Sequence, residues 1–139
     1  MLITRFAGYA PWEAIYGYSR VVVAGDWAIT AGTTATGRDG TVLHPGNAYA
    51  QTLAAFGIAL DALLAAGAAV ERVVRTRMYV TDIASQAEVG RAHHELFGRI
   101  RPVATMVEVA KLADPSHLVE VEFEAYIENR DRERSQMED

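Results

Sequence analysis

Short runs of β-branched residues alternate along the chain with two longer amphipathic segments. Two apolar runs, 21–24 and 28–31, flank Gly25 and Asp26, a pair typical of tight turns, and they predict a β-hairpin. Apolar residues also alternate with polar ones later in the chain, which is typical of half-buried strands. Three further strands are therefore expected, over residues 73–81, 104–110 and 119–127.

Two helices are predicted between these strands. The first spans 48–66, with Asn47 as its N-cap and Gly67 where it stops. The second begins after Ser85, whose spacing to Glu88 fits a capping box. Helical spacing gives each segment one apolar stripe. The stripes are Tyr49, Leu53, Phe56, Leu60, Leu63 and Leu64 in the first, and Val89, Ala92, Leu96, Phe97 and Ile100 in the second.

The order of these elements is ββ-α-β-α-ββ, which predicts an α+β fold. Two helices with one apolar face each must cover one face of a sheet. Strand periodicity separates the two faces of that sheet. The expected covered rows are Val74, Thr76, Met78 and Val80, and Val119, Val121, Phe123, Ala125 and Ile127.

The opposite sheet face carries charge and tyrosine. Its expected rows are Val73, Arg75, Arg77, Tyr79 and Thr81, and Glu120, Glu122, Glu124 and Tyr126. One interpretation is a solvated face whose charges pair weakly. The other is a subunit interface with a polar ligand cleft, because tyrosine and arginine are enriched at interfaces. The pattern leaves both open.

Length, net charge and cysteine content exclude several classes of function. The 139 residues suit one domain, expected over 1–127, while eight of the twelve residues in 128–139 are charged and suggest a disordered tail. A net charge of −5 argues against nucleic-acid binding, and the absence of cysteine excludes a thiol nucleophile. No signal peptide and no membrane-spanning run is expected, so the default location is the cytoplasm.

Four histidines offer little for a metal. His93 and His94 are adjacent on a predicted helix and point about 100° apart, so they cannot chelate one ion as neighbours. His93 lies four residues from Val89 and from Phe97, which favours a packed, hydrogen-bonded histidine. With only His44 and His117 besides, no metal site is expected.

Five segments together resemble the RidA (YjgF) superfamily, over about residues 16–127. The resemblance rests on Tyr18-Ser19, Gly25-Asp26-Trp27-Ala28-Ile29-Thr30-Ala31-Gly32-Thr33, Val74-Arg75-Thr76-Arg77-Met78-Tyr79-Val80-Thr81-Asp82, Pro102-Val103-Ala104-Thr105-Met106-Val107-Glu108-Val109 and Val121-Glu122-Phe123-Glu124-Ala125. It implies a chorismate-mutase-like α+β subunit with a mixed β-sheet and two helices on one face. Such subunits form homotrimers around a central barrel, with small-metabolite clefts between subunits.

The best-known activity of this superfamily is hydrolysis of reactive enamines and imines to a keto acid and ammonia, without a cofactor. By resemblance, Glu122 orients water or substrate, Tyr18 is the cleft tyrosine, and Gly32 supplies a backbone contact. The sequence departs from the pattern elsewhere. Thr33 replaces a frequent glutamine, Met106 a frequent cysteine, and Ala104 the arginine that grips the substrate carboxylate.

The loss of that arginine makes the usual 2-iminopropanoate activity doubtful. Arg77 has the strand parity to face the same side as Glu122, so it could supply the missing charge, but a structural ion pair with the glutamates is the favoured interpretation. Three functions are weighed: a deaminase-like hydrolase, a non-catalytic small-ligand binding or sensor protein, and an endoribonuclease or translation inhibitor. The acidic net charge argues against the last.

Overall fold

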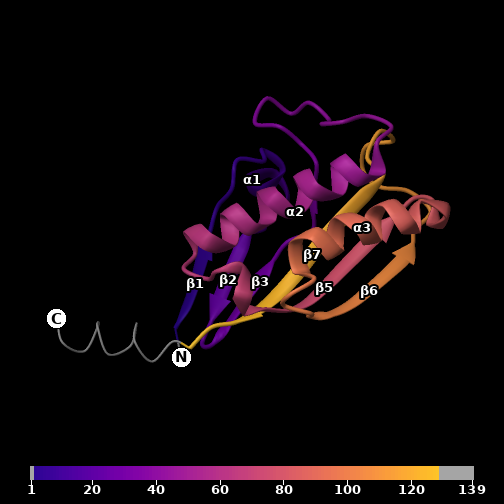
Figure 1. Cartoon of the computed structure of the whole chain (residues 1–139). Helices are drawn as coiled ribbons and strands as arrows, with labels where there is room; N and C mark the ends of the chain where they lie inside the picture. Colours follow the sequence, from indigo (N-terminus) through magenta and orange to yellow (C-terminus); the bar gives the residue numbers. More distant parts are fainter. Residues whose placement is uncertain (1, 129–139) are drawn as a thin grey trace.

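A single mixed sheet forms the body of the chain in a computed structural model that describes residues 2–128 (Figure 1). Its strand order is β1-β2-β3-β7-β5-β6, and the short β4 pairs with β7. The strands are β1 (Ile3–Phe6), β2 (Val21–Ala24), β3 (Trp27–Thr30), β4 (Thr33–Thr34), β5 (Val73–Val80), β6 (Val103–Glu108) and β7 (Val119–Tyr126). The helices are α1 (Trp12–Tyr16), α2 (Ala48–Ala65) and α3 (Gln86–Phe97), with 3-10 turns at Val70–Arg72 and Ile83–Ser85.

The predicted hairpin is confirmed, because β2 and β3 pair antiparallel through the turn at Gly25 and Asp26. Among the strands of residues 2–128, only β5 and β6 pair in parallel, because α3 carries the chain back across the sheet between them. Three short elements, β1, α1 and the two-residue β4, escaped the sequence analysis. They have four, five and two residues, respectively, which is too few for a periodic pattern to be recognised.

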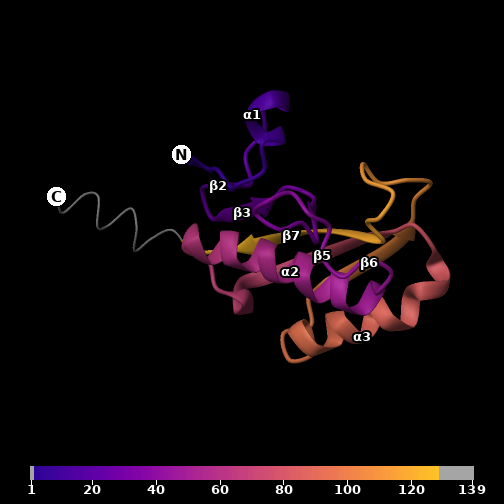
Figure 2. The ribbon, with the colours of Figure 1, turned by 90° about the horizontal axis from the view of Figure 1, so that it is seen from above.

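Both long helices lie on one face of the sheet, as predicted (Figure 2). Phe56 of α2, Phe97 of α3 and Phe123 of β7 are fully buried and form an aromatic cluster beneath the helices, with ring centroids 5.1–6.3 Å apart. Burial of these large side chains fixes the helices to the sheet.

The predicted apolar stripe of α2 is partly wrong. Leu64 is 64% exposed, whereas the buried face consists of Gln51, Thr52, Ala55, Phe56, Ala59 and Leu63. The helix itself carries apolar residues on all sides, so periodicity could not identify the side that faces the sheet. Small alanines face inward because they let the helix axis approach the sheet closely.

One predicted cap is confirmed and the other is wrong. The Asn47 side chain accepts a hydrogen bond from the Ala50 N–H at 3.0 Å, as an N-cap should. Ser85 makes no capping bond to α3, and its hydroxyl donates instead to the Asp82 carbonyl at 2.7 Å. A 3-10 turn capped by Asp82 precedes α3, so the capping box expected with Glu88 does not form.

The predicted faces of β5 are wrong at Val73 and Val74 because of a β-bulge. Val73 is buried and Val74 is 39% exposed, the reverse of the alternation expected from Thr76 onward. The pairing with β7 shifts between Val73 and Arg75, and one extra residue at that point moves each preceding side chain to the other face.

α2 is long and apolar enough to meet a length-and-composition criterion for crossing a membrane. It lies on the sheet, however, with Ala55, Phe56, Ala59 and Leu63 inaccessible to solvent. A core helix meets the same criterion, so this is weak evidence for a span. The charged segment 128–139 falls outside the described residues, apart from Glu128.

Candidate functional site

The sheet face opposite α2 and α3, here called the open face, carries a ladder of opposite charges formed by Arg75, Arg77, Glu122 and Glu124. β5 and β7 pair so that Arg75 lies beside Glu124 and Arg77 beside Glu122. The Arg77 guanidinium lies 3.0 Å from Glu124 and 3.5 Å from Glu122, and Arg75 lies 3.8 Å from Glu124. The favoured expectation of a structural ion pair for Arg77 is therefore confirmed.

Glu122 is held by two donors on this face. The Tyr79 hydroxyl donates to Glu122 Oε1 at 2.5 Å, and Arg77 approaches the same oxygen. The bond to Glu122 raises the pKa of Tyr79, and the bond to Glu124 raises the pKa of Arg77, because each partner stabilises the protonated form. Glu122 is thus a positioned carboxylate with one oxygen engaged, an arrangement able to orient water.

Tyr18 lies between α1 and β2 and is 40% exposed. It lines an open hollow of about 400 Å³. The Arg20 guanidinium lies 5.6 Å from the centre of the Tyr18 ring, within range of a cation–π interaction. Residues lining the hollow are Arg5, Ala7, Gly8, Ala10, Glu13, Ala14, Tyr18 and Ser19.

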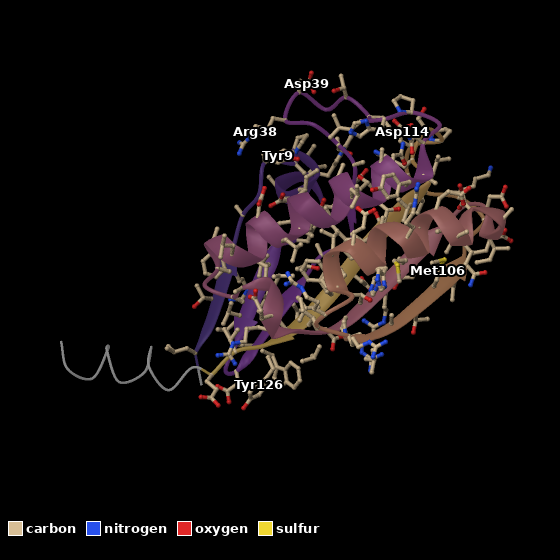
Figure 3. The ribbon with its side chains drawn as sticks, in the orientation of Figure 1. Tyr9, Arg38, Asp39, Met106, Asp114 and Tyr126 are labelled. Carbon is tan, nitrogen blue, oxygen red and sulfur yellow. The ribbon has the colours of Figure 1, made fainter. Side chains whose placement is uncertain are left out.

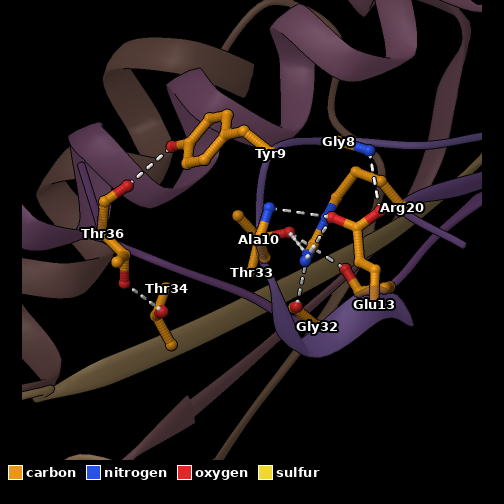
Figure 4. A network of polar contacts seen from close by, with 10 residues as sticks. Gly8, Tyr9, Ala10, Glu13, Arg20, Gly32, Thr33, Thr34 and Thr36 are labelled. Atoms are coloured by element: carbon orange, nitrogen blue, oxygen red, sulfur yellow. Dashed lines mark hydrogen bonds and ion pairs between the residues drawn. The ribbon is translucent and has the colours of Figure 1, made fainter. Parts of the chain in front are cut away.

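A buried ion pair that the sequence analysis missed organises this region (Figure 4). Glu13 and Arg20 are 7% and 9% exposed, and their charged groups lie 3.5 Å apart. Glu13 accepts from the Gly8 and Ala10 N–H groups at 2.8 and 3.2 Å. Glu13 lies in the five-residue helix α1 and Arg20 lies outside the regular elements, so no periodic sequence pattern points to the pair.

Arg20 also holds two of the expected ligand residues. Its guanidinium donates to the Gly32 carbonyl at 2.8 Å and to Thr33 Oγ1 at 3.0 Å (Figure 4). Thr33 is buried and its hydroxyl in turn donates to the Ala31 carbonyl at 3.1 Å. The structure therefore engages the Thr33 hydroxyl within the subunit, which accounts for a threonine here without a ligand.

Gly32 is partly exposed and lies beside Glu120. Its N–H makes no hydrogen bond to another group among residues 2–128. A Cβ added at Gly32 would lie 3.0 Å from both Cδ and Oε2 of Glu120, so glycine permits the close approach of that carboxyl.

Ala104 and Met106 lie on the other side of the sheet from Glu122. They occupy β6 beside Thr76 and Met78, which are buried under the helices. Figure 3 labels Met106 on this strand. β6 is the last strand of the sheet, and Ala104 is exposed along that edge. Within one subunit, Ala104 and Glu122 therefore do not line a common surface.

His93 is packed and hydrogen-bonded, as predicted. Its Nε2 lies 2.8 Å from Thr76 Oγ1, and its ring contacts those of Phe56 and Phe97. Burial lowers the pKa of His93, and the neighbouring His94 lowers it further. Within the described chain no group of three His, Asp or Glu side chains is arranged to hold a metal ion.

Comparison with known proteins identifies the fold class. A protein of Mycobacterium tuberculosis, described as a member of the highly conserved YjgF/YER057c/UK114 family, has 43% sequence identity and a TM-score of 0.82, covering 91% of this chain and all of that one. The YjgF gene product of E. coli has 28% identity and a TM-score of 0.77, over 88% of this chain and 98% of that one. The fold is therefore the chorismate-mutase-like α+β fold of these proteins, as expected.

The family follows from the sequence itself. Residues 9–127 match the family described as Endoribonuclease L-PSP, and the chain belongs to this family, also called RidA or YjgF. An uncharacterized protein of Streptomyces coelicolor is 43% identical over 124 residues, covering 89% of this chain and 92% of that protein.

Proposed function

We propose that the chain forms a homotrimer whose intersubunit clefts bind a small imine or enamine and hydrolyse it to a carbonyl compound and ammonia. The observation that carries this proposal is the geometry of Glu122, which accepts the Tyr79 hydroxyl at 2.5 Å and lies 3.5 Å from Arg77 on the open face. A carboxylate oriented in this way can position water against a C=N bond. No cofactor is needed for this chemistry.

The cleft is proposed to lie between subunits because its residues lie apart within one subunit. Glu122 faces the open side, while Ala104 and Met106 occupy an edge strand on the helix-covered side. A neighbouring subunit packed against that edge would bring the two sets together. Tyr18 is proposed to contact the ligand, and the free Gly32 N–H to donate to it.

The substrate is proposed to lack a carboxylate. Ala104 offers no donor where active relatives carry an arginine, and Arg77, the candidate substitute, is already paired with Glu122 and Glu124. A neutral imine would not require the missing cation.

The test is ammonia release from two freshly generated imines, 2-iminopropanoate and its carboxylate-free counterpart 2-iminopropane. We expect little release from the first and measurable release from the second. Ala104→Arg should shift the preference toward 2-iminopropanoate by at least about tenfold, the effect of about 1.4 kcal/mol, and Glu122→Gln should remove both activities. A wild-type preference for 2-iminopropanoate would contradict the proposed substrate class.

A second candidate is a non-catalytic binding or sensor protein that uses the same cleft. The ion pairs of Arg77 with Glu122 and Glu124 favour this second function. They leave no unpaired cation beside Glu122, among the described residues of the open face, to polarise a substrate. A ligand that raises the melting temperature without being consumed would support it. An endoribonuclease role is disfavoured by the three glutamates on the open face and the net charge of −5.

A further inference from the structure

Glu120 stands two residues before Glu122 on β7 and projects from the same face of the sheet. Its carboxyl lies against the α-carbon of Gly32, since a Cβ there would lie 3.0 Å from Glu120 Cδ and Oε2. Side chains two residues apart on a strand project about 7 Å from each other. The two glutamates are therefore neighbours along the same face of β7, with the Glu120 carboxyl beside the Gly32 backbone.

The three glutamates of this face differ in their partners. Glu122 is bound by Tyr79 and Arg77, and Glu124 by Arg75 and Arg77. The Glu120 carboxyl forms no hydrogen bond or ion pair with any residue in the described range 2–128, although it is half-buried. A partly desolvated carboxyl without a donor favours its protonated form.

Some groups around Glu120 raise its pKa and others lower it. Burial raises the pKa of Glu120, and the negative charge of Glu122 on the same strand raises it further. Arg20 and His117 lower the pKa. Both are engaged elsewhere, however, Arg20 with Glu13 and the Gly32 carbonyl, and His117 with the Thr36 hydroxyl at 3.0 Å. Tyr79 lies opposite Glu120 on β5, but its hydroxyl donates a hydrogen bond to Glu122 and not to Glu120.

We propose that Glu120 is a second catalytic carboxyl, which donates a proton to the substrate nitrogen while Glu122 accepts one from water. The inference rests on the proposed function and assigns the general acid that hydrolysis of a neutral imine requires. Two carboxyls in contrasting environments commonly divide acid and base roles in this way.

The proton transfers balance over the reaction. Water adds its oxygen to the imine carbon, its proton passes to Glu122, and the Glu120 proton passes to nitrogen, giving a carbinolamine. The carbinolamine hydroxyl then returns a proton to Glu120 as the C=O bond forms. Nitrogen takes the proton held by Glu122 and leaves as ammonia, so both carboxyls regain their starting states.

The test compares Glu120→Gln with the matched control Glu124→Gln. Both replace a glutamate on the same face of β7, but Glu124 is paired with arginines and has no proposed chemical role. The measurement is the pH profile of kcat/KM for 2-iminopropane hydrolysis, with circular dichroism and light scattering to verify folding and assembly. We expect Glu120→Gln to lower kcat/KM about 100-fold and to remove the fall in rate at high pH. Glu124→Gln should keep the wild-type profile.

A second measurement is independent of turnover. Carboxyl ¹³C NMR titration should give Glu120 a pKa above the ordinary glutamate value, and Gly32→Ala should shift the Glu120 resonance by displacing its side chain. An active wild type with an unchanged profile in Glu120→Gln would overturn the role of Glu120 and leave the proposed function standing. A wild type inactive on both imines would overturn the proposed function, and the role of Glu120 with it.

Discussion

The half-buried His93 illustrates how single residues in this chain are held. The His93 ring contacts Phe56 and Phe97, and within residues 2–128 only the Thr76 hydroxyl is within hydrogen-bond range of its Nε2. Burial and His94 lower the pKa of His93, so the folded state resists protonation of this ring. Such a residue links stability to pH.

We expect the free energy of unfolding to fall as pH drops below about 6.5, the unperturbed histidine value. In that range the unfolded chain binds a proton that folded His93 does not, so acid favours unfolding. His93→Gln, which keeps a hydrogen-bonding group for Thr76, should flatten this dependence in urea unfolding between pH 5 and 7. The exposed His94→Gln should retain most of it. Equal slopes for wild type and His93→Gln would refute the assignment.

For single residues of β7, the sequence predicted correctly which face of the sheet a side chain occupies, because successive residues of a strand point to opposite faces. Alternation along β7 placed Glu122 on the open face and Phe123 in the core, as the structure has them. Strand alternation could not reveal that, of the three glutamates on this face, Glu120 is the one without a hydrogen-bond or ion-pair partner within residues 2–128. Nor could it reveal that Gly32, far away in sequence, lies beside the Glu120 carboxyl. Contacts between residues remote in sequence leave no local pattern.

Among the elements, the segment that contains α1 depends on one buried ion pair. Glu13 fixes the loop at Gly8 and Ala10, and Arg20 fixes the chain at Gly32 and Thr33. These bonds join the α1 segment to the chain between β3 and β4. The pair therefore positions Tyr18 relative to the Gly32 backbone.

We expect Glu13→Gln to destabilise the fold by about 3 kcal/mol, since it leaves the Arg20 charge buried and unpaired. Arg20→Met should also destabilise, and the double variant should lose less than the sum of the two. Urea unfolding of the three variants measures the coupling energy. Additive losses would show that the two side chains do not act as a pair.

The long elements were predictable and the irregular ones were not. Asn47 and Gly67 bound α2 closely, because caps are local chemistry. The bulge at Val73 and the 3-10 turn before α3 were missed, since each depends on pairing or packing with a distant segment. Apolar residues occur on all sides of α2, so the sequence did not show which side is buried.

For the whole molecule, the open sheet face is the surface from which assembly is expected. Beside the charge ladder it exposes Trp27, Ile29 and Tyr126, with the Trp27 and Tyr126 rings 5.4 Å apart. Aromatic and apolar groups gathered with arginine are typical of interfaces. The residue pattern left an interface and a solvated face open, and only the family resemblance supplied the trimer.

We expect light scattering to give a mass near three times 15.2 kDa. Ile29→Glu, which adds a charge to the open face, should yield a folded monomer. Leu64→Glu is the matched control, because Leu64 is exposed on α2, away from the open face, and its substitution should leave the trimer intact. A trimeric Ile29→Glu variant would place the interface elsewhere.

The most direct test of the account is subunit mixing, because Glu122 and Ala104 are proposed to meet only across an interface. Glu122→Gln removes the carboxylate and Ala104→Trp fills the cleft from the neighbouring subunit, so each variant alone should be inactive on 2-iminopropane. Co-refolded in equal amounts, they should recover about one quarter of wild-type ammonia release, since random assortment in a cyclic trimer leaves that fraction of interfaces intact. A mixture no more active than its components would contradict the shared cleft.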